Sequence, residues 1–220
     1  MIDESPFADL MAQVEERLAD VPEGDGMDPL DAALVRLAVS VSVTCLDSEA
    51  IDEAVVAALE SGATAAQVQE VVALVSGLGV HSIMASATVV LQRAAERGLV
   101  DPAAPLDEER RALWDRFVGD DPYWDAFSRH VPGFLDAMLC LSPDIFSGFF
   151  AYCAIPWKSG TVPALTKELA AIACDVTPTH LFLPGVRLHL QNAIGLGATR
   201  TVVRQAIAIG TQARAAAMIR

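Results

Sequence analysis

The chain has 220 residues, of which 53% are apolar, and its mean hydropathy is positive. This composition can supply a sizeable buried core, and it excludes the disordered and low-complexity classes. A formal net charge of −14 offers no basic surface to neutralise phosphates, so we expect neither nucleic acid nor a membrane as a partner. The acidic start lacks the basic and apolar stretches of a secretory signal, so we expect a cytoplasmic protein.

Three segments in the first third of the chain show apolar residues at helical spacing, and each predicts an amphipathic helix: 34–41, 54–58 and 68–75. Ser61 and Gly62 are typical of the end of the second helix. Thr64 followed by Gln67 predicts a capping box that begins the third helix.

The segment 71–91 holds 21 residues without a charge other than one on His81, which is long enough to span a bilayer. Gly77 and Gly79 interrupt it, and hydroxyl side chains are scattered along it. We therefore predict a buried helical hairpin, with His81 as a packing residue at the break.

The same pattern occurs twice in the chain. With an offset of 135 residues, GATAAQVQEVVA at 62–73 aligns without a gap with GATRTVVRQAIA at 197–208. Two copies so far apart predict a duplicated domain, because solenoid arrays repeat at much shorter periods. No alternation typical of strands appears, so we predict an all-α fold.

We expect three parts along the chain. Residues 1–98 hold the N-terminal helices and the first repeat, 99–159 form an aromatic-rich helical connection, and 160–220 hold the second repeat. Eleven of the thirteen aromatic residues lie between Trp114 and Trp157. They either pack the two repeats together or line a pocket, and Tyr152 and Trp157 are the candidates for contact with a substrate. Three helix starts in this connection have N-cap residues: Asp107, Asp121 and Ser142.

The candidate chemistry lies in the second repeat, where five ionisable residues accompany an apolar helical stripe: Glu168, Asp175, His180, Arg187 and His189. Pro184 and Gly185 predict a helix start that would place His189 in or near the first turn. There the helix dipole lowers the pKa of an imidazole, and a neutral histidine near a carboxylate suits general acid–base catalysis.

The first repeat lacks this polar set. In the ungapped register the five residues correspond, in the same order, to Ala33, Ser40, Cys45, Asp52 and Ala54. A residue that only builds the repeat should recur in both copies, so the asymmetry favours a functional role. The alternative remains that His189 is a satisfied core histidine.

We expect no metal and no cofactor. The four cysteines form neither a CxxC pair nor a zinc pattern. Asp175, His180 and His189 are loosely similar to the two-histidine, one-carboxylate set for iron, but their spacing is not a recognised one.

At these residues the sequence resembles the carboxymuconolactone decarboxylase and alkyl hydroperoxidase D-like family. The motifs are KEL at 167–169, and a histidine, His189, eight residues before GAT at 197–199. Two-copy members share GxHS, here 79–82, and THLxxPGxRxH, here 179–189. The resemblance implies an all-helical fold and a homo-oligomer, a trimer or a dimer or hexamer.

The departures from the family are informative. Peroxidase members carry a CxxC pair where this chain has Phe182 and Gly185, so we exclude a disulfide-cycling peroxidase. The second repeat also has Ala216 where the first has His81.

The resemblance then implies a cofactor-independent decarboxylase-like enzyme acting on a small carboxylated or oxo substrate. His189 would carry the proton, Glu168 would orient the imidazole, and Arg187 or His180 would hold the substrate carboxylate. Asp175, with Tyr152 and Trp157, would complete the substrate site. Two alternatives stay open: another proton-transfer or carbon–carbon bond reaction at the same site, or a non-catalytic oligomeric binding protein.

Overall fold

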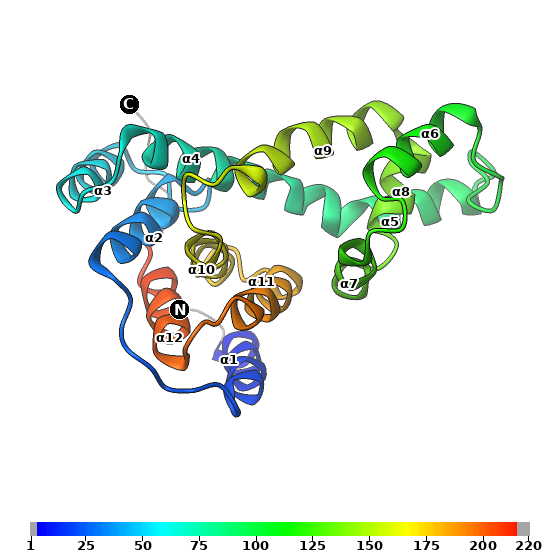
Figure 1. Ribbon diagram of the computed structural model, residues 1–220. Coiled ribbons are helices and arrows are strands. Elements are labelled where there is room, and N and C mark those ends of the chain that lie inside the picture. The colour runs from blue at the N-terminus through cyan, green and yellow to red at the C-terminus, as the bar shows by residue number, and fades with distance from the viewer. Residues whose placement is uncertain (1–3, 215–220) are drawn as a thin grey trace. The chain divides into compact units, whose positions relative to one another are not determined.

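The computed structural model describes residues 4–214, which form helices and loops with no strand among them (Figure 1). This confirms the predicted all-α class. The helices are α1 Glu4–Leu18, α2 Pro29–Val41, α3 Ser48–Glu60, α4 Ala65–Ser76, α5 His81–Glu96, α6 Glu108–Phe117, α7 Pro122–His130, α8 Phe134–Leu141, α9 Pro143–Lys158, α10 Ala164–Asp175, α11 Leu183–Gly195 and α12 Arg200–Thr211. A short 3-10 helix, Gly77–Val80, lies between α4 and α5.

The chain divides into two compact units. The first comprises Met1–Leu78 and Pro156–Arg220, and the second comprises Gly79–Ile155. Within the first unit α10 is central: it packs against α2, α4, α11 and α12, and its residues from Thr166 to Asp175 are all buried (Figure 1). Helices of both predicted repeats thus share one hydrophobic core. The boundaries of the compact units therefore differ from those predicted from the sequence, which lie at residues 98 and 159.

Helix bounds in the first unit follow the register of the sequence repeat. The pairs α2 and α10, α3 and α11, and α4 and α12 each begin 135 residues apart. The predicted capping box of Thr64 and Gln67 is confirmed, and Thr199 caps α12 with its hydroxyl. Gly62 and Gly197, which follow α3 and α11, have positive φ angles of 95° and 88°. Such backbone favours glycine and ends each helix.

Hydrogen bonds between the two repeats follow the same register. The N–H of Val162 donates to Oε1 of Glu70 at 3.2 Å, and the N–H of Met27 donates to Oε1 of Gln205 at 2.5 Å. The two donors, Met27 and Val162, lie 135 residues apart in the sequence, and so do the two acceptors, Glu70 and Gln205. This reciprocal pattern supports the duplication that the sequence predicts.

The second unit has an aromatic core of its own. Phe117 stacks on Phe150 with ring centroids 4.8 Å apart, and Trp124 meets Phe150 edge to face at 5.0 Å. Phe146 and Phe134 are fully buried among these rings. Most of the aromatic residues therefore pack against one another within the second unit, and the two alternatives, packing of the repeats or a pocket wall, stay predictions.

The predicted helical hairpin at 71–91 is also wrong. Residues Ala65–Glu96 form one helical segment of 32 residues, and only 22% of its most apolar window is buried. Gly77 and Gly79 do not adopt the positive φ that would help to reverse the chain, so they continue the segment through the 3-10 turn. The segment is long and apolar enough to cross a membrane. Length and composition are weak evidence for a membrane span, because the core helices of soluble proteins share them.

Candidate functional site

Glu168 and His189 form a hydrogen-bonded pair between α10 and α11. Nδ1 of His189 lies 2.7 Å from Oε2 of Glu168. The other carboxylate oxygen, Oε1, accepts a hydrogen bond from Nδ2 of Asn192 at 3.2 Å. Asn192 follows His189 by three residues on α11, so both reach the same carboxylate from one helix face. The carboxylate is thus held at both oxygens, and Nε2 is the nitrogen of the imidazole that does not bond to Glu168.

The pKa of His189 is raised above its ordinary value. Burial on its own lowers it, but the hydrogen bond and charge of Glu168, together with the charge of Asp175, outweigh that effect. The prediction of a pKa lowered by the helix dipole is therefore wrong. Because α11 begins at Leu183, His189 lies in its second turn, and the dipole effect falls off within the first.

Trp157 covers one face of this imidazole. The two rings are nearly parallel, at 7°, with centroids 5.6 Å apart. The indole remains 39% exposed, whereas the side chain of His189 is only 12% exposed. An indole face stabilises a cation placed over it, so this contact also favours imidazolium. Trp157 is therefore both a neighbour of His189 and an accessible aromatic wall.

Asp175 lies at the other end of α10, fully buried against the first turn of α11. Its Oδ2 is 2.1 Å from where a Cβ on Gly185 would be, so only glycine leaves room for it. Burial raises the pKa of Asp175 to about 7, although the charge of His189 lowers it in part. This carboxyl group can therefore hold or release a proton near neutral pH.

His180 lies on the turn after α10 and is associated with Asp175. Its Nε2 is 3.7 Å from Oδ1 of Asp175, and its ring stacks on Phe182 with centroids 5.7 Å apart. Burial lowers the pKa of His180, so the neutral form prevails. The expectation that Asp175, His180 and His189 hold no metal stays a prediction.

The structure does not bring Arg187 to the other candidates. Its Nε and Nη2 both donate to Oε1 of Gln13 on α1, at 2.9 and 2.5 Å. Two residues along an α-helix correspond to a rotation of about 200°, so Arg187 and His189 lie on different faces of α11. Arg187 ties α11 to α1. Tyr152 belongs to the second unit and is 55% exposed, and its role in substrate binding stays a prediction.

The first repeat has a hollow where the second has this polar cluster. A cavity of about 710 Å³ is lined by residues that include the counterparts of Glu168, Asp175, His180, His189 and Asn192, namely Ala33, Ser40, Cys45, Ala54 and Ala57. Small side chains in one repeat thus correspond to ionisable or amide side chains in the other. The two repeats therefore differ in this region in their side chains, while their helices correspond.

The sequence argument did not single out three polar residues of this region: Asn192, Lys167 and Glu70. Asn192 carries a signal that was available, since it follows His189 at helical spacing. Lys167, quoted only as part of the KEL motif, is buried and pairs with Glu70. Nothing local in the sequence marks Glu70 as its partner.

No family sequence model matches the chain, and no curated protein matches its sequence. Among solved structures, the chain is similar to a protein of Burkholderia xenovorans described as a gamma-carboxymuconolactone decarboxylase subunit. The TM-score is 0.71 and the identity 28%, and the match covers 94% of this chain and 78% of that one.

The chain therefore shares an all-α fold with a protein described as a carboxymuconolactone decarboxylase subunit, and this likeness covers most of both chains. This agrees with the resemblance seen in the KEL and GAT motifs.

Proposed function

We propose that the second repeat catalyses acid–base chemistry, of the decarboxylase type, on a small carboxylated or oxo substrate without a cofactor. One observation carries the proposal: the hydrogen bond of 2.7 Å between Glu168 and Nδ1 of His189, in a nearly enclosed position. Glu168 orients the imidazole and favours its protonated form. Nε2 is then the atom that can give a proton to a substrate.

In the proposed step, the bond between the substrate carbon and its carboxylate breaks, carbon dioxide leaves, and the electron pair enters an enolate-type intermediate. Nε2–H of His189 donates its proton to the carbon that lost the carboxylate. The imidazole then regains a proton from solvent, and Glu168 keeps its hydrogen bond to Nδ1 throughout.

The surroundings of His189 suggest how a substrate would lie. Trp157 offers a partly exposed aromatic surface beside the imidazole ring, suited to an unsaturated or cyclic substrate. His180 is the remaining candidate for contact with the substrate carboxylate, since Arg187 is bound to Gln13. A cytoplasmic location and a homo-oligomer stay predictions, and so does the absence of nucleic-acid and membrane partners.

A different proton-transfer reaction at the same pair is the second candidate function. The hydrogen-bonded imidazole supports proton transfer in general, and it does not select among substrates. A non-catalytic binding protein is less favoured, because ionisable Glu168 is buried and the His189 side chain bonded to it is only 12% exposed, an arrangement typical of reactive sites.

The test is release of carbon dioxide from a panel of γ-carboxylated lactones, β-keto acids and hydroxy acids. We expect the wild-type chain to decarboxylate one of these classes, and His189→Gln to reduce turnover by about 100-fold or more with helicity retained. His130→Gln, on α7 of the second unit, is the matched control and should retain turnover. Unchanged turnover in His189→Gln would remove this residue from the mechanism, and a wild-type chain inactive on the whole panel would refute the decarboxylase proposal.

A further inference from the structure

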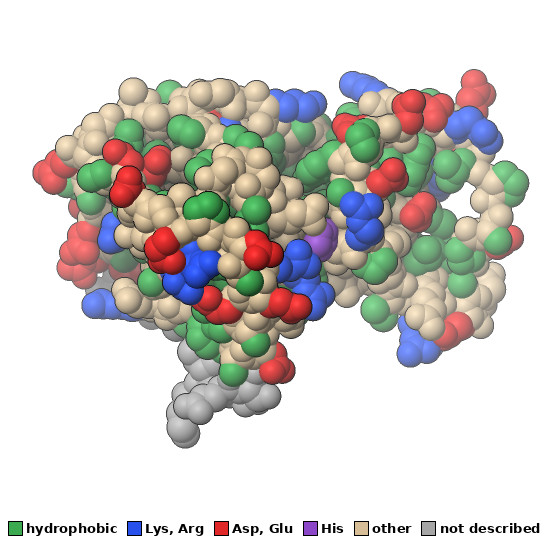
Figure 2. All heavy atoms as spheres, turned by 60° about the horizontal axis from the view of Figure 1, so that its bottom comes forward, with side chains coloured by type: hydrophobic (Ala, Val, Ile, Leu, Met, Phe, Trp, Pro, Cys, Tyr) green, Lys and Arg blue, Asp and Glu red, His purple; other side chains and the backbone are tan. Residues whose placement is uncertain are grey.

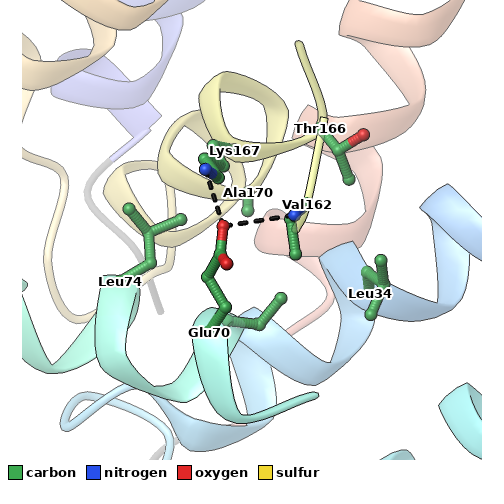
Figure 3. A pocket seen from close by; sticks show the side chains of 8 residues that line it. Leu34, Glu70, Leu74, Val162, Thr166, Lys167 and Ala170 are labelled. Atoms are coloured by element: carbon green, nitrogen blue, oxygen red, sulfur yellow. Dashed lines mark hydrogen bonds and ion pairs between the residues drawn. The ribbon is translucent and has the colours of Figure 1, made fainter. Parts of the chain in front are cut away.

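A buried ion pair joins α4 to α10 in the first unit. Nζ of Lys167 lies 2.6 Å from Oε1 of Glu70, with side chains only 2% and 8% exposed (Figure 3). The space around the pair, which includes Leu34, Leu74 and Ala170, has no room for a water molecule. The two charges therefore depend on protein groups for all of their solvation.

Every hydrogen-bonding position of this ammonium group is used. Besides Glu70, Nζ of Lys167 donates to the carbonyl oxygens of Pro156 and Ser159, each at 2.6 Å. An ammonium group has three protons, so the set is complete. Pro156 and Ser159 stand on either side of Trp157, and Lys167 thus fixes the backbone that carries this ring.

Glu70 holds the continuation of the same segment. Its Oε2 accepts a hydrogen bond from Oγ of Ser159 at 2.5 Å. Its Oε1 accepts one from the N–H of Val162 at 3.2 Å, which Figure 3 shows. Burial on its own would raise the pKa of Glu70, but these hydrogen bonds and that from Lys167 hold it below its ordinary value. The carboxylate is therefore charged at neutral pH.

We propose that Glu70 and Lys167 are positioning residues that hold Trp157 flat against His189. Through them the first repeat, which lacks the ionisable site, contributes to the site of the second. Without them Trp157, in the last turn of α9 and with its indole 39% exposed, would be free to adopt other rotamers. The consequence for turnover rests on the proposed function, whereas the consequence for Trp157 does not.

The experiment follows the fluorescence of Trp157 as His189 titrates. Trp114→Phe and Trp124→Phe leave Trp157 as the one tryptophan, since the chain has three. A stacked imidazole quenches indole emission more strongly when it is protonated, so emission should fall as the pH is lowered through the pKa of His189. Loss of this step in His189→Gln assigns it.

Lys167→Met in this background should reduce the pH-dependent step by about half or more, because the indole leaves the imidazole face. Ser159→Ala should reduce it to a smaller degree. Arg204→Met is the matched control: it breaks an ion pair with Glu15 of similar length, 2.7 Å, that is exposed and far from Trp157 in sequence. The control should keep the full step.

A double variant, Glu70→Gln with Lys167→Met, guards against a trivial failure to fold, because it buries no unpaired charge. If Lys167→Met or this double variant folds and shows the parent's step in full, the inference is overturned. In the turnover assay the same variants should raise KM more than they lower kcat, since Trp157 contacts substrate and His189 transfers the proton. If the wild-type chain shows no turnover, the proposed function fails. The fluorescence experiment still tests this inference, because it does not depend on turnover.

Discussion

The buried carboxyl group of Asp175 leads to a quantitative prediction about stability and pH. Its pKa rises from an ordinary value of 3.8 to about 7 on folding. Between these two values the unfolded chain has released the proton and the folded chain keeps it, so the free energy of unfolding falls as the pH rises. Over the whole interval the loss is about 4 kcal/mol. Below the lower pKa and above the upper one, Asp175 adds no further pH dependence.

Asp175→Asn removes the titrating group with little change of volume, a requirement set by Gly185. Unfolding by urea should be followed from about pH 5.5 to about pH 8, where Asp175 accounts for a loss of about 2 kcal/mol. This range avoids the isoelectric point near 4.5. Wild type should lose that much more stability across the range than Asp175→Asn.

His189 acts in the same direction. Its raised pKa stabilises the fold at low pH, and this contribution is lost as the pH rises through the folded pKa. Asp52→Asn, which changes an exposed aspartate on α3, is the control and should keep the wild-type slope. If Asp175→Asn shows the wild-type dependence on pH, then Asp175 is not a buried acid that retains its proton, and the description of the site is wrong.

Glycine substitutions give two further predictions. Gly210→Ala would place a Cβ 2.0 Å from the carbonyl oxygen of Ala173, so we expect a loss of about 1–3 kcal/mol in urea unfolding, whereas Gly195→Ala meets nothing within 4 Å and should be close to neutral. Equal stability of the two variants would contradict the close packing of α12 on α10. Gly197→Ala and Gly62→Ala should each cost about 1–2 kcal/mol, because both positions have positive φ and open surroundings. A stabilising effect at either position would show that its backbone does not require glycine.

Local sequence signals predicted the helices of the first unit well. Thr64 and Gln67 fixed the start of α4, because a capping box depends on neighbours within one turn. The same reasoning placed a helix end at Gly62. These features could be predicted because each is decided by a few adjacent residues.

The hairpin prediction failed for a related reason. Gly77 and Gly79 permit a reversal, but they do not require one, and here they form part of a 3-10 turn between α4 and α5. Whether a glycine reverses the chain depends on what the following helix can pack against. That is a property of the tertiary fold, which the periodicity of one segment does not contain.

The candidate site was predictable in part, through the comparison of the two repeats. Ionisable Glu168 and His189, matched to Ala33 and Ala54, indicated which repeat carries the pair. The contact of Arg187 with Gln13 could not be predicted, because Gln13 is 174 residues away along the chain and belongs to no motif. The direction of the pKa shift of His189 was missed because it depends on which carboxylate the imidazole reaches.

The most direct test of the central claim is an NMR titration of the His189 imidazole in wild type and in Glu168→Gln. The claim is that Glu168 holds this buried ring and favours its protonated form. It predicts a wild-type pKa above the ordinary value of 6.5 and a clear decrease in Glu168→Gln, since burial then acts with less opposition. A wild-type pKa at or below the ordinary value, or one that Glu168→Gln leaves unchanged, would contradict it.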